Sequence, residues 1–468
     1  MKNLNSGWWK TKTRLLTGLT IACLMAVMLP IPQASARETI TVVDSWGQEI
    51  VIPYPVERIV SVNMLVDELI VALGGEDKVV GVDLMPLYMP EFYPTLQDKA
   101  SVGLHHFPSY EKVIDLNPQV VITSSILCFL PGFNEKLEAA GIKTVTIDGW
   151  MPEVYDRDVR TLGKILGKED RAEELIKFTH SYLDLVAGRV KDIPPEERTK
   201  VYWEFHFPFM TMTKGSPHNT MIEMAGGKNV FAGAGGGLFQ MPSSMKIPAG
   251  MKIPTRIKLP AGTKLPNGMV LEEGIEVKME EVSPGVYKGK VKIGGEEVEI
   301  DMGEAGLPEI LLPSGLGRED IEITIPTMLF RLVSPEAIVG ANPEVMIGEY
   351  MPMGEMTGMI GKLMGGGIPI MPFGYTSEPD PDCLKSVVDD MTGRPAAKAI
   401  DAVVEGRVYA FPFGMLLSSA RWPVGICYLA KMFYPDRFED IDPEALHKEW
   451  IEKWYGLKYQ GLFIYPEI

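Results

Sequence analysis

Two spacings of apolar residues alternate along the first part of the chain. Thr39–Pro53 alternates apolar and polar positions around Ser45–Gln48, which predicts a β-hairpin. Arg58–Asn63 is a short apolar run, typical of a buried strand, and Met64–Gly75 has helical spacing and ends at glycine. Such strand and helix patterns repeat, and this repetition is typical of βαβ units around a mostly parallel sheet. We therefore predict an N-terminal α/β lobe over residues 37–152.

A long helical period follows this lobe. Apolar residues keep the spacing of one helix face up to Lys191, Asp170 can cap its start, and Pro194 and Pro195 end it. At about 1.5 Å per residue, such a helix of 22 residues spans roughly 33 Å. That length is enough to run along two lobes and join them, so residues 153–195 are predicted to be a linking helical region.

The strand and helix alternation resumes over residues 196–468. In Ser334–Tyr350, Ser334 can cap a helix, the Asn342-Pro343 step ends it, and an apolar strand follows. This order repeats that of Ser109–Ser125 in the first lobe. The pattern therefore predicts an α/β fold of two Rossmann-like lobes that share a cleft.

Two segments interrupt the second lobe. Residues 234–328 contain a hexapeptide repeated from Lys246 to Met269, in which the regular prolines forbid a continuous helix. A three-strand meander is predicted after it, so we interpret 234–328 as a β-rich insert that is either a stabilising decoration or functional. Residues 351–374 are rich in methionine and glycine. They are expected to form either a mobile flap or a loop buried under the insert.

The N-terminus has the pattern of a secretory signal peptide. Residues 1–14 are basic, residues 15–32 are mostly apolar, and Ala34–Ala36 is a small-x-small site. We predict cleavage after Ala36 and a periplasmic or otherwise extracytoplasmic protein. The alternative is a retained membrane anchor, but Pro30 and Pro32 break the helix early for a bilayer span.

Composition narrows the function classes. The chain is 46% hydrophobic and 23% charged, which is a globular composition. Its formal net charge of −17 argues against a nucleic-acid partner, which requires clustered cations. Cys128, Cys383 and Cys427 allow at most one disulfide after signal removal, and no zinc-type cysteine spacing occurs. We find no catalytic or nucleotide-binding motif in a fitting context, so no enzyme activity is expected.

A series of stretches extends over nearly the whole mature chain, the insert excepted. It includes VVDSWGQEIVIPYPVERIVSVN, YEKVIDLNPQVVI, GSPHNTMIEMAGGKNVF, VSPEAIVGANPEVMI, GRPAAKAIDAVVEGRVYAF and GMLLSSARWPVGI. In this order the stretches resemble the cobalamin, haem and ferric-siderophore solute-binding proteins of ABC transporters. The resemblance implies a receptor that captures a metal chelate (a corrinoid, haem or a ferric siderophore) between its lobes. Its partners would be a permease dimer and its ATPase. No resident cofactor is implied, although the ligand would contain iron or cobalt.

The resemblance also assigns two residues to transporter docking. In this family one glutamate on each lobe binds arginines of the permease, and the matching positions are Glu111 and Glu336. Both lie early in a predicted helix before an Asn-Pro step, so the two lobes would present them alike. Charge-assisted pairs with arginine would set register and encounter rate. The alternative is that each carboxylate only complements a helix dipole.

Candidate ligand contacts lie on loops at strand ends, where open α/β sheets bind ligands. Aromatic residues would give flat apolar contact, arginine would bind a propionate or phosphate, and histidine could ligate iron or cobalt. Adjacent histidines point to opposite sides of an extended chain, so one metal is not expected to take both. The candidates are Tyr88, His105, His106, Phe107, His206, Phe207, Phe209, Arg421 and Trp422.

Two other functions stay open at this point. A receptor for bare zinc or manganese would need three or four converging ligands, and the chain has six histidines with no histidine-rich loop. A binding module that uses the insert to hold another protein is the other alternative.

Overall fold

The computed structural model describes most of the two lobes and the strands of the insert. The described residues are 38–104, 107–124, 133–206, 208–233, 256–259, 275–283, 286–293, 296–301, 323–324, 330–350, 374–412 and 419–468. The predicted signal peptide therefore lies outside them, as do nearly all of the methionine-rich segment and most of the hexapeptide repeat. Within the described ranges, none of the helices combines the length and apolar character that crossing a bilayer requires.

The first lobe contains a five-stranded parallel sheet and an antiparallel hairpin. The hairpin strands are β1 (Thr39–Val43) and β2 (Glu49–Pro53). The sheet has the order β5 (Ala100–Ser101), β4 (Val79–Val82), β3 (Ile59–Ser61), β8 (Val120–Thr123) and β9 (Lys143–Thr146). Its helices are α2 (Met64–Ala72), α3 (Leu84–Leu87), α4 (Tyr110–Asp115), α5 (Phe133–Ala139) and α6 (Tyr155–Leu166).

The second lobe contains a mixed sheet. Its order is β18 (Phe330–Leu332), β11 (Met210–Met212), β10 (Lys200–His206), β19 (Val345–Tyr350) and β20 (Val408–Ala410), with β12 (Lys228–Asn229) beside β10. Strands β10, β12, β19 and β20 are parallel, whereas β11 is antiparallel to its neighbours. Its helices are α8 (Pro217–Met224), α9 (Pro335–Ala341), α11 (Pro381–Gly393), α12 (Asp401–Val404), α13 (Trp422–Phe433) and α14 (Pro443–Trp454).

The two Asn-Pro steps have the same structure in both lobes. The hydroxyl of Ser109 accepts a hydrogen bond at the start of α4, and that of Ser334 does so at the start of α9, as predicted for Ser334. After each helix, Asn117 and Asn342 have positive φ values of 46° and 42°. Asparagine tolerates this left-handed backbone better than most residues, and the following proline keeps the helix from continuing. The lobes therefore repeat one helix-turn-strand unit.

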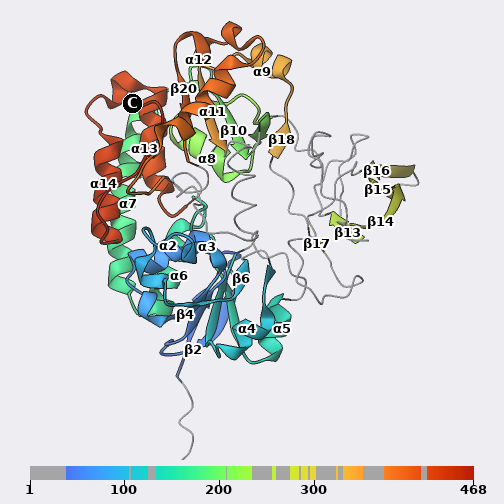
Figure 1. The fold of residues 1–468 in the computed structure, drawn as a ribbon, viewed down its shortest axis with the longest axis vertical. Helices are drawn as coiled ribbons and strands as arrows, with labels where there is room; N and C mark the ends of the chain where they lie inside the picture. The colour runs from blue at the N-terminus through green and yellow to red at the C-terminus, as the bar shows by residue number, and fades with distance from the viewer. Residues whose placement is uncertain are drawn as a thin grey trace, which may run out of the picture.

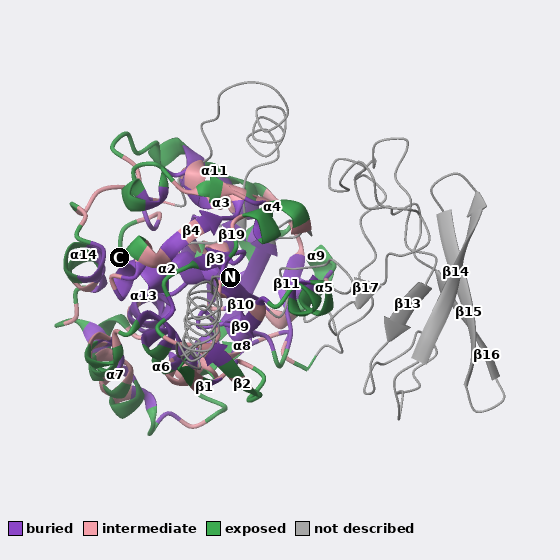
Figure 2. Cartoon of the chain, turned by 90° about the horizontal axis from the view of Figure 1, so that it is seen from below, coloured by how far each residue is buried: buried purple, intermediate pink, exposed green. Residues whose placement is uncertain are grey.

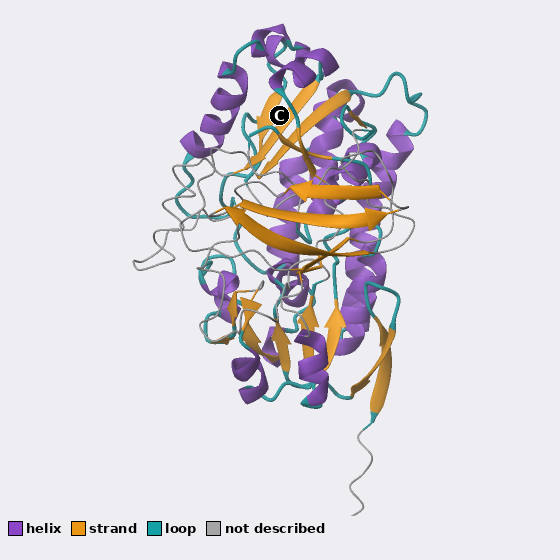
Figure 3. Cartoon of the chain, turned by 90° about the vertical axis from the view of Figure 1, so that its right-hand side faces the viewer, coloured by secondary structure: helices purple, strands orange, loops and turns teal. Residues whose placement is uncertain are grey.

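Helix α7 (Glu169–Val190) has 22 residues and runs along one side of both lobes (Figure 1). The prediction that Asp170 caps it is wrong: Lys168 is the N-cap residue and makes no side-chain cap, while Asp170 lies in the first turn. In the first turn, the negative charge of Asp170 interacts favourably with the positive end of the helix dipole. Figure 3 shows the first sheet below the second, so the predicted α/β fold of two lobes joined by one long helix is confirmed.

The predicted β-rich insert forms its own sheet. In chain order, its strands lie between β12 and β18 of the second lobe. Its strands are β13 (Arg256–Leu259), β14 (Ile275–Ser283), β15 (Val286–Ile293), β16 (Glu296–Asp301) and β17 (Ile323–Thr324). The predicted meander corresponds to β14, β15 and β16. Among the described residues these strands pair only with one another. The boundaries given above for the signal peptide, lobes and insert stay predictions.

One hydrophobic core passes through both lobes. It contains Val120 and Ile122 of β8 together with Val345 and Ile347 of β19, whereas the residues between them in each strand belong to two smaller clusters on the outer faces. This division follows from the alternation of side chains along a strand. Helix α13 is buried almost throughout and α7 exposes its outer side (Figure 2). The lobes are therefore packed together along α7 and α13.

The insert is expected to be dispensable for folding of the lobes. Replacing residues 234–328 by a flexible Gly/Ser linker should leave one cooperative thermal transition, with a Tm within a few degrees of that of the intact chain. The reason is that the insert's described strands complete no hydrogen bond of either lobe's sheet. Scanning calorimetry checks this, and a split or lost transition in the shortened chain would contradict it.

Candidate interlobe ligand site

The carboxyl ends of the parallel strands in the two lobes point toward each other. Helices α2, α3 and α8 lie between the two sheets (Figure 1). The strand order reverses between β3 and β8 in the first sheet and between β10 and β19 in the second. Loops diverge at such reversals and leave a crevice outside the strand ends, where open α/β sheets bind ligands. The region between the lobes is therefore the candidate site.

Asn63 fixes the reversal point of the first lobe. Its side-chain amide donates to the backbone oxygens of Thr123, at 3.2 Å, and Ile147, at 2.6 Å. Its side-chain oxygen accepts a bond from the amide of Leu65 and so caps α2. Asn63 is wholly buried. One side chain thus ties the ends of three neighbouring strands to the first turn of α2.

Two buried acids lie beside this point. Asp83 follows β4 and caps α3 through the amide of Met85, at 2.7 Å, while Asp67 lies in the first turn of α2. Burial raises the pKa of Asp83 to about 7. Burial also raises the pKa of Asp67 well above its usual value, and the charge of Asp83 adds to the effect. Like charges in a dry environment disfavour ionisation of both carboxyls. At mildly acidic pH these two buried carboxyl groups therefore hold protons.

The ends of β8 and β9 carry a second polar group of residues. The hydroxyl of Ser124 donates to the Asp148 carboxylate at 2.7 Å. Asp158 of α6 accepts hydrogen bonds from the Asp148 amide, at 2.7 Å, and from the Ser45 hydroxyl, at 2.6 Å. Burial raises the pKa of Asp158 to about 6, although these two hydrogen bonds oppose the shift. The network joins the hairpin, the sheet and α6 directly beneath the strand ends.

The second lobe presents a buried His–Glu pair at its own strand ends. His218, in the first turn of α8, lies 3.3 Å from Glu349, near the end of β19. The His218 ring is packed between Trp203 and Phe205 of β10, with both ring centroids at 4.6 Å. Both polar side chains are almost fully buried. The pair therefore places an imidazole and a carboxylate together beneath the strand ends of the second lobe.

Two of the predicted aromatic contacts are partly exposed. Tyr88 is the C-cap residue of α3, next to the buried acids. Phe209 has a φ of 67° and its ring lies under the guanidinium of Arg394, at 4.3 Å. Arg394 makes two hydrogen bonds of 2.6 Å to Glu204, which also accepts the amide of Phe209 at 2.8 Å. The backbone and ring of Phe209 are thus held by a buried ion pair within the second lobe.

Arg421 and Trp422 lie in the interior. Arg421 is wholly buried and pairs with Glu68 of α2, and Trp422 packs edge-on against Tyr155 at 5.4 Å. The predicted binding of a ligand anion by Arg421 would require this pair to open. The other candidates, His105, His106 and Phe207, lie outside the described residues. Phe107 of β7 (Phe107–Pro108) and His206 of β10 are described only as backbone. All of these ligand roles stay predictions.

The two predicted docking acids occupy matching positions. Glu111 lies in the first turn of α4 and Glu336 in the first turn of α9, and both are exposed. A hydrogen bond from its own backbone amide, and a second from Ser334, lower the pKa of Glu336, so this carboxylate is charged at neutral pH. Both helices lie on the side of the lobes away from α7 (Figure 1). Their role in docking stays a prediction.

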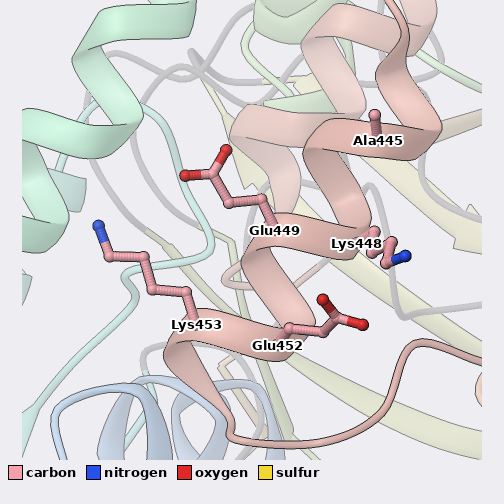
Figure 4. Close-up of a pocket in the computed structure, with 5 residues that line it drawn as sticks. All are labelled: Ala445, Lys448, Glu449, Glu452 and Lys453. Atoms are coloured by element: carbon pink, nitrogen blue, oxygen red, sulfur yellow. The ribbon is translucent and has the colours of Figure 1, made fainter.

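Where side chains are described, no three His, Cys, Asp or Glu residues converge as metal ligands, and Cys383 and Cys427 are buried. A hollow of about 450 Å³ lies instead along the outer face of α14 (Figure 4). It is lined by Ala445, Lys448, Glu449, Glu452 and Lys453. Tyr182 and Glu174 of α7 bind Glu449 and Lys453 from the neighbouring helix. This is a charged surface hollow on α14, away from the strand ends.

The residues that the sequence reasoning missed are mostly acids. Asp83 ends an apolar strand and His218 follows a Ser-Pro helix start, so a polar residue directly after a strand or cap was an available signal for both. Asp67 and Glu349 gave no such signal, because each lies inside an apolar helical or strand pattern. Only the packed structure shows that these side chains meet.

Residues 59–249 match the family model described as periplasmic binding protein. The chain is 28% identical over 198 residues to the uncharacterized ABC transporter substrate-binding lipoprotein YvrC of Bacillus subtilis (strain 168). That match covers 41% of this chain and spans 61% of the length of this curated relative.

Two solved structures share the fold. The TroA-like periplasmic binding protein FepB from Veillonella parvula has a TM-score of 0.58 at 20% identity, covering 91% of this chain and 99% of its own. The molybdate periplasmic binding protein MolA of Haemophilus influenzae, bound to molybdate, has a TM-score of 0.54 at 17% identity, covering 90% and 99%. At these identities the likeness shows the fold alone.

The buried acids predict a specific pH dependence of stability. Because the pKa of Asp83 is raised to about 7, the folded state keeps a proton that the unfolded state loses near its ordinary pKa of 3.8. Stability from this proton is present at acidic pH and is lost as the pH rises from about 4 to about 7. Asp83→Asn retains the cap and removes the titration. The Tm of the variant minus that of the wild type should therefore be a few degrees more positive at about pH 8 than at about pH 4.5.

The matched control is Asp98→Asn, since the Asp98 side chain is 79% exposed in the same lobe. Its Tm difference from the wild type should be the same at both pH values. If the Asp83→Asn difference were equally independent of pH, the raised pKa would be refuted.

Proposed function

Because residues 59–249 match the periplasmic binding protein family model, we propose that the chain is the solute-binding receptor of an ABC transporter. It captures a small ligand between its two lobes and delivers it to a permease dimer that an ATPase drives. The observation that carries the proposal is the pair of lobes, joined by α7, whose strand ends face each other. Such a site is largely formed before the ligand arrives, so little ordering opposes binding.

The exposed acids support delivery to a transporter. Glu111 and Glu336 occupy the same turn of equivalent helices, one on each lobe. A carboxylate on each lobe lets a partner with two arginine clusters bind both lobes at once and respond to their spacing. Charge-assisted bonds to arginine are stronger than neutral ones and set the register of the complex.

We propose a metal chelate as the ligand: a corrinoid, haem or a ferric siderophore. Support comes from the aromatic and histidine candidates on the strand-end loops, of which Tyr88 and Phe209 are partly exposed. Flat aromatic faces suit a macrocycle or an aryl chelator. An anionic ligand group would have to reach Arg421 by separating it from Glu68. We also propose that residues 1–36 export the protein, so that it works outside the cytoplasm.

The docking acids are tested by charge reversal. Replacing both Glu111 and Glu336 by arginine should abolish uptake in cells that carry the transporter, because like charges would then face each other at both contacts. Ligand affinity of the purified receptor should change by no more than a few-fold. The control is the double change Glu169→Arg and Glu444→Arg, which alters exposed acids in the first turns of α7 and α14. The control also replaces two first-turn acids by arginine and so loses the same favourable interaction with the helix dipole, but on the side of the molecule opposite α4 and α9. Loss of uptake in both double variants would therefore argue against docking.

The ligand class is tested by fluorescence titration. The chain has eight tryptophans, and Trp203 contacts His218 at the strand ends of the second lobe. One of the three chelate classes should therefore quench the intrinsic fluorescence of the purified protein with one-to-one stoichiometry. Zinc and manganese salts are titrated in parallel. Saturable binding of a bare metal, with no response to any chelate, would overturn the chelate proposal and identify the ligand as a divalent cation.

A further inference from the structure

The contacts between the lobes include a fully buried ion pair on the α7 side of the molecule. Glu68 belongs to α2 of the first lobe, and Arg421 immediately precedes α13 of the second. The guanidinium of Arg421 donates to the two carboxylate oxygens of Glu68, at 3.1 and 3.4 Å. The exposed fraction is 0% for the Arg421 side chain and 1% for that of Glu68. The pair therefore crosses the lobe boundary without contact with water.

Hydrogen bonds and aromatic rings around this pair restrict the orientation of both side chains. The hydroxyl of Tyr455 donates to Glu68 at 2.6 Å, and Arg421 lies 3.0 Å from Nε2 of His447. Burial and the charge of Arg421 lower the pKa of His447 well below its usual value, so the neutral ring accepts this hydrogen bond. The Phe92 and Phe463 rings lie 5.0 and 5.8 Å from the guanidinium.

A second set of contacts crosses the boundary nearby. Glu91 accepts hydrogen bonds from the amide of Ser377, at 2.7 Å, and from the side chain of Gln460, at 2.9 Å. The Phe92 ring packs against Tyr375 and Tyr455 of the second lobe, at 5.2 and 5.4 Å. These first-lobe residues follow each other in the chain, and Tyr455 contacts both Phe92 and Glu68, so this second set of contacts lies beside the ion pair.

Such a pair contributes geometry more than stability. Burial of two charges costs about as much free energy as their attraction returns, and the directional bonds that remain allow one arrangement only. We propose that Glu68 and Arg421 are positioning residues that pin the two lobes at their α7 edge. Motion of the lobes is then limited to a small rotation about this point. The edge with α4 and α9, opposite α7, moves most (Figure 1).

The test removes both charges, because a single substitution would leave one charge buried and unpaired and the chain could fail to fold. The variant is Glu68→Gln with Arg421→Met. The matched control is Glu204→Gln with Arg394→Met. It removes another Arg–Glu pair, in which the glutamate is fully buried and the arginine side chain is 11% exposed, and which lies within the second lobe. Spin labels at Glu138→Cys and Glu405→Cys, both exposed and on different lobes, report the interlobe distance by pulsed dipolar EPR. The background replaces Cys128, Cys383 and Cys427 by alanine.

The interlobe distance distribution of the Glu68/Arg421 double variant should become roughly twice as wide as that of the wild type, because the rotation loses its fixed point. The control should keep the wild-type distribution while its Tm falls. Equal distributions in all three proteins would overturn the proposal, and so would equal broadening in both double variants. The measurement needs neither ligand nor transporter, so its outcome is independent of the receptor function proposed above.

Discussion

The packing of α13 against α7 is the contact on which the arrangement of the molecule depends. Helix α7 runs along both lobes, and α13, buried almost throughout, joins it to the interior of the second lobe. The inner faces of both sheets contribute to one continuous core that also contains residues of these two helices. Because the interior of a protein is close-packed, neither lobe can shift along α7 without opening a cavity. The distance between the facing strand ends is therefore a consequence of core packing.

Within this frame, polar groups are buried near the facing strand ends of both lobes. The first lobe buries Asp67 and Asp83, and the second buries His218 against Glu349. A buried charge is costly unless it is paired or neutralised, so each of these groups either holds a proton or has a partner. Proteins retain such costly groups most often where they act on a ligand or fix a geometry. Under the proposals above, Glu68 and Arg421 fix the geometry of the lobes, whereas the polar groups at the strand ends lie near the proposed ligand site.

Local patterns predicted much of the fold. The alternation of strand and helix periods gave the two lobes, and the run of apolar residues on one helix face gave α7 to within one residue at each end. The repeated Ser-to-Asn-Pro unit identified equivalent helices, because capping and helix termination depend on neighbouring residues only. The start of α7 was misjudged, since an acid in a first helical turn and an acid at the cap position are alike in sequence. The roles of the candidate ligand residues could not be derived in this way.

By itself, the sequence determined the order of many strands and helices and the equivalent positions of the exposed acids of α4 and α9, because these follow from residues close together in the chain. Only the tertiary structure decided what the buried polar side chains do. Arg421 suggested an anion-binding residue, yet its partner Glu68 lies 353 positions away and the pair is closed to water. The physical reason is that a side chain's charge and availability depend on its neighbours in space, which a one-dimensional pattern does not contain.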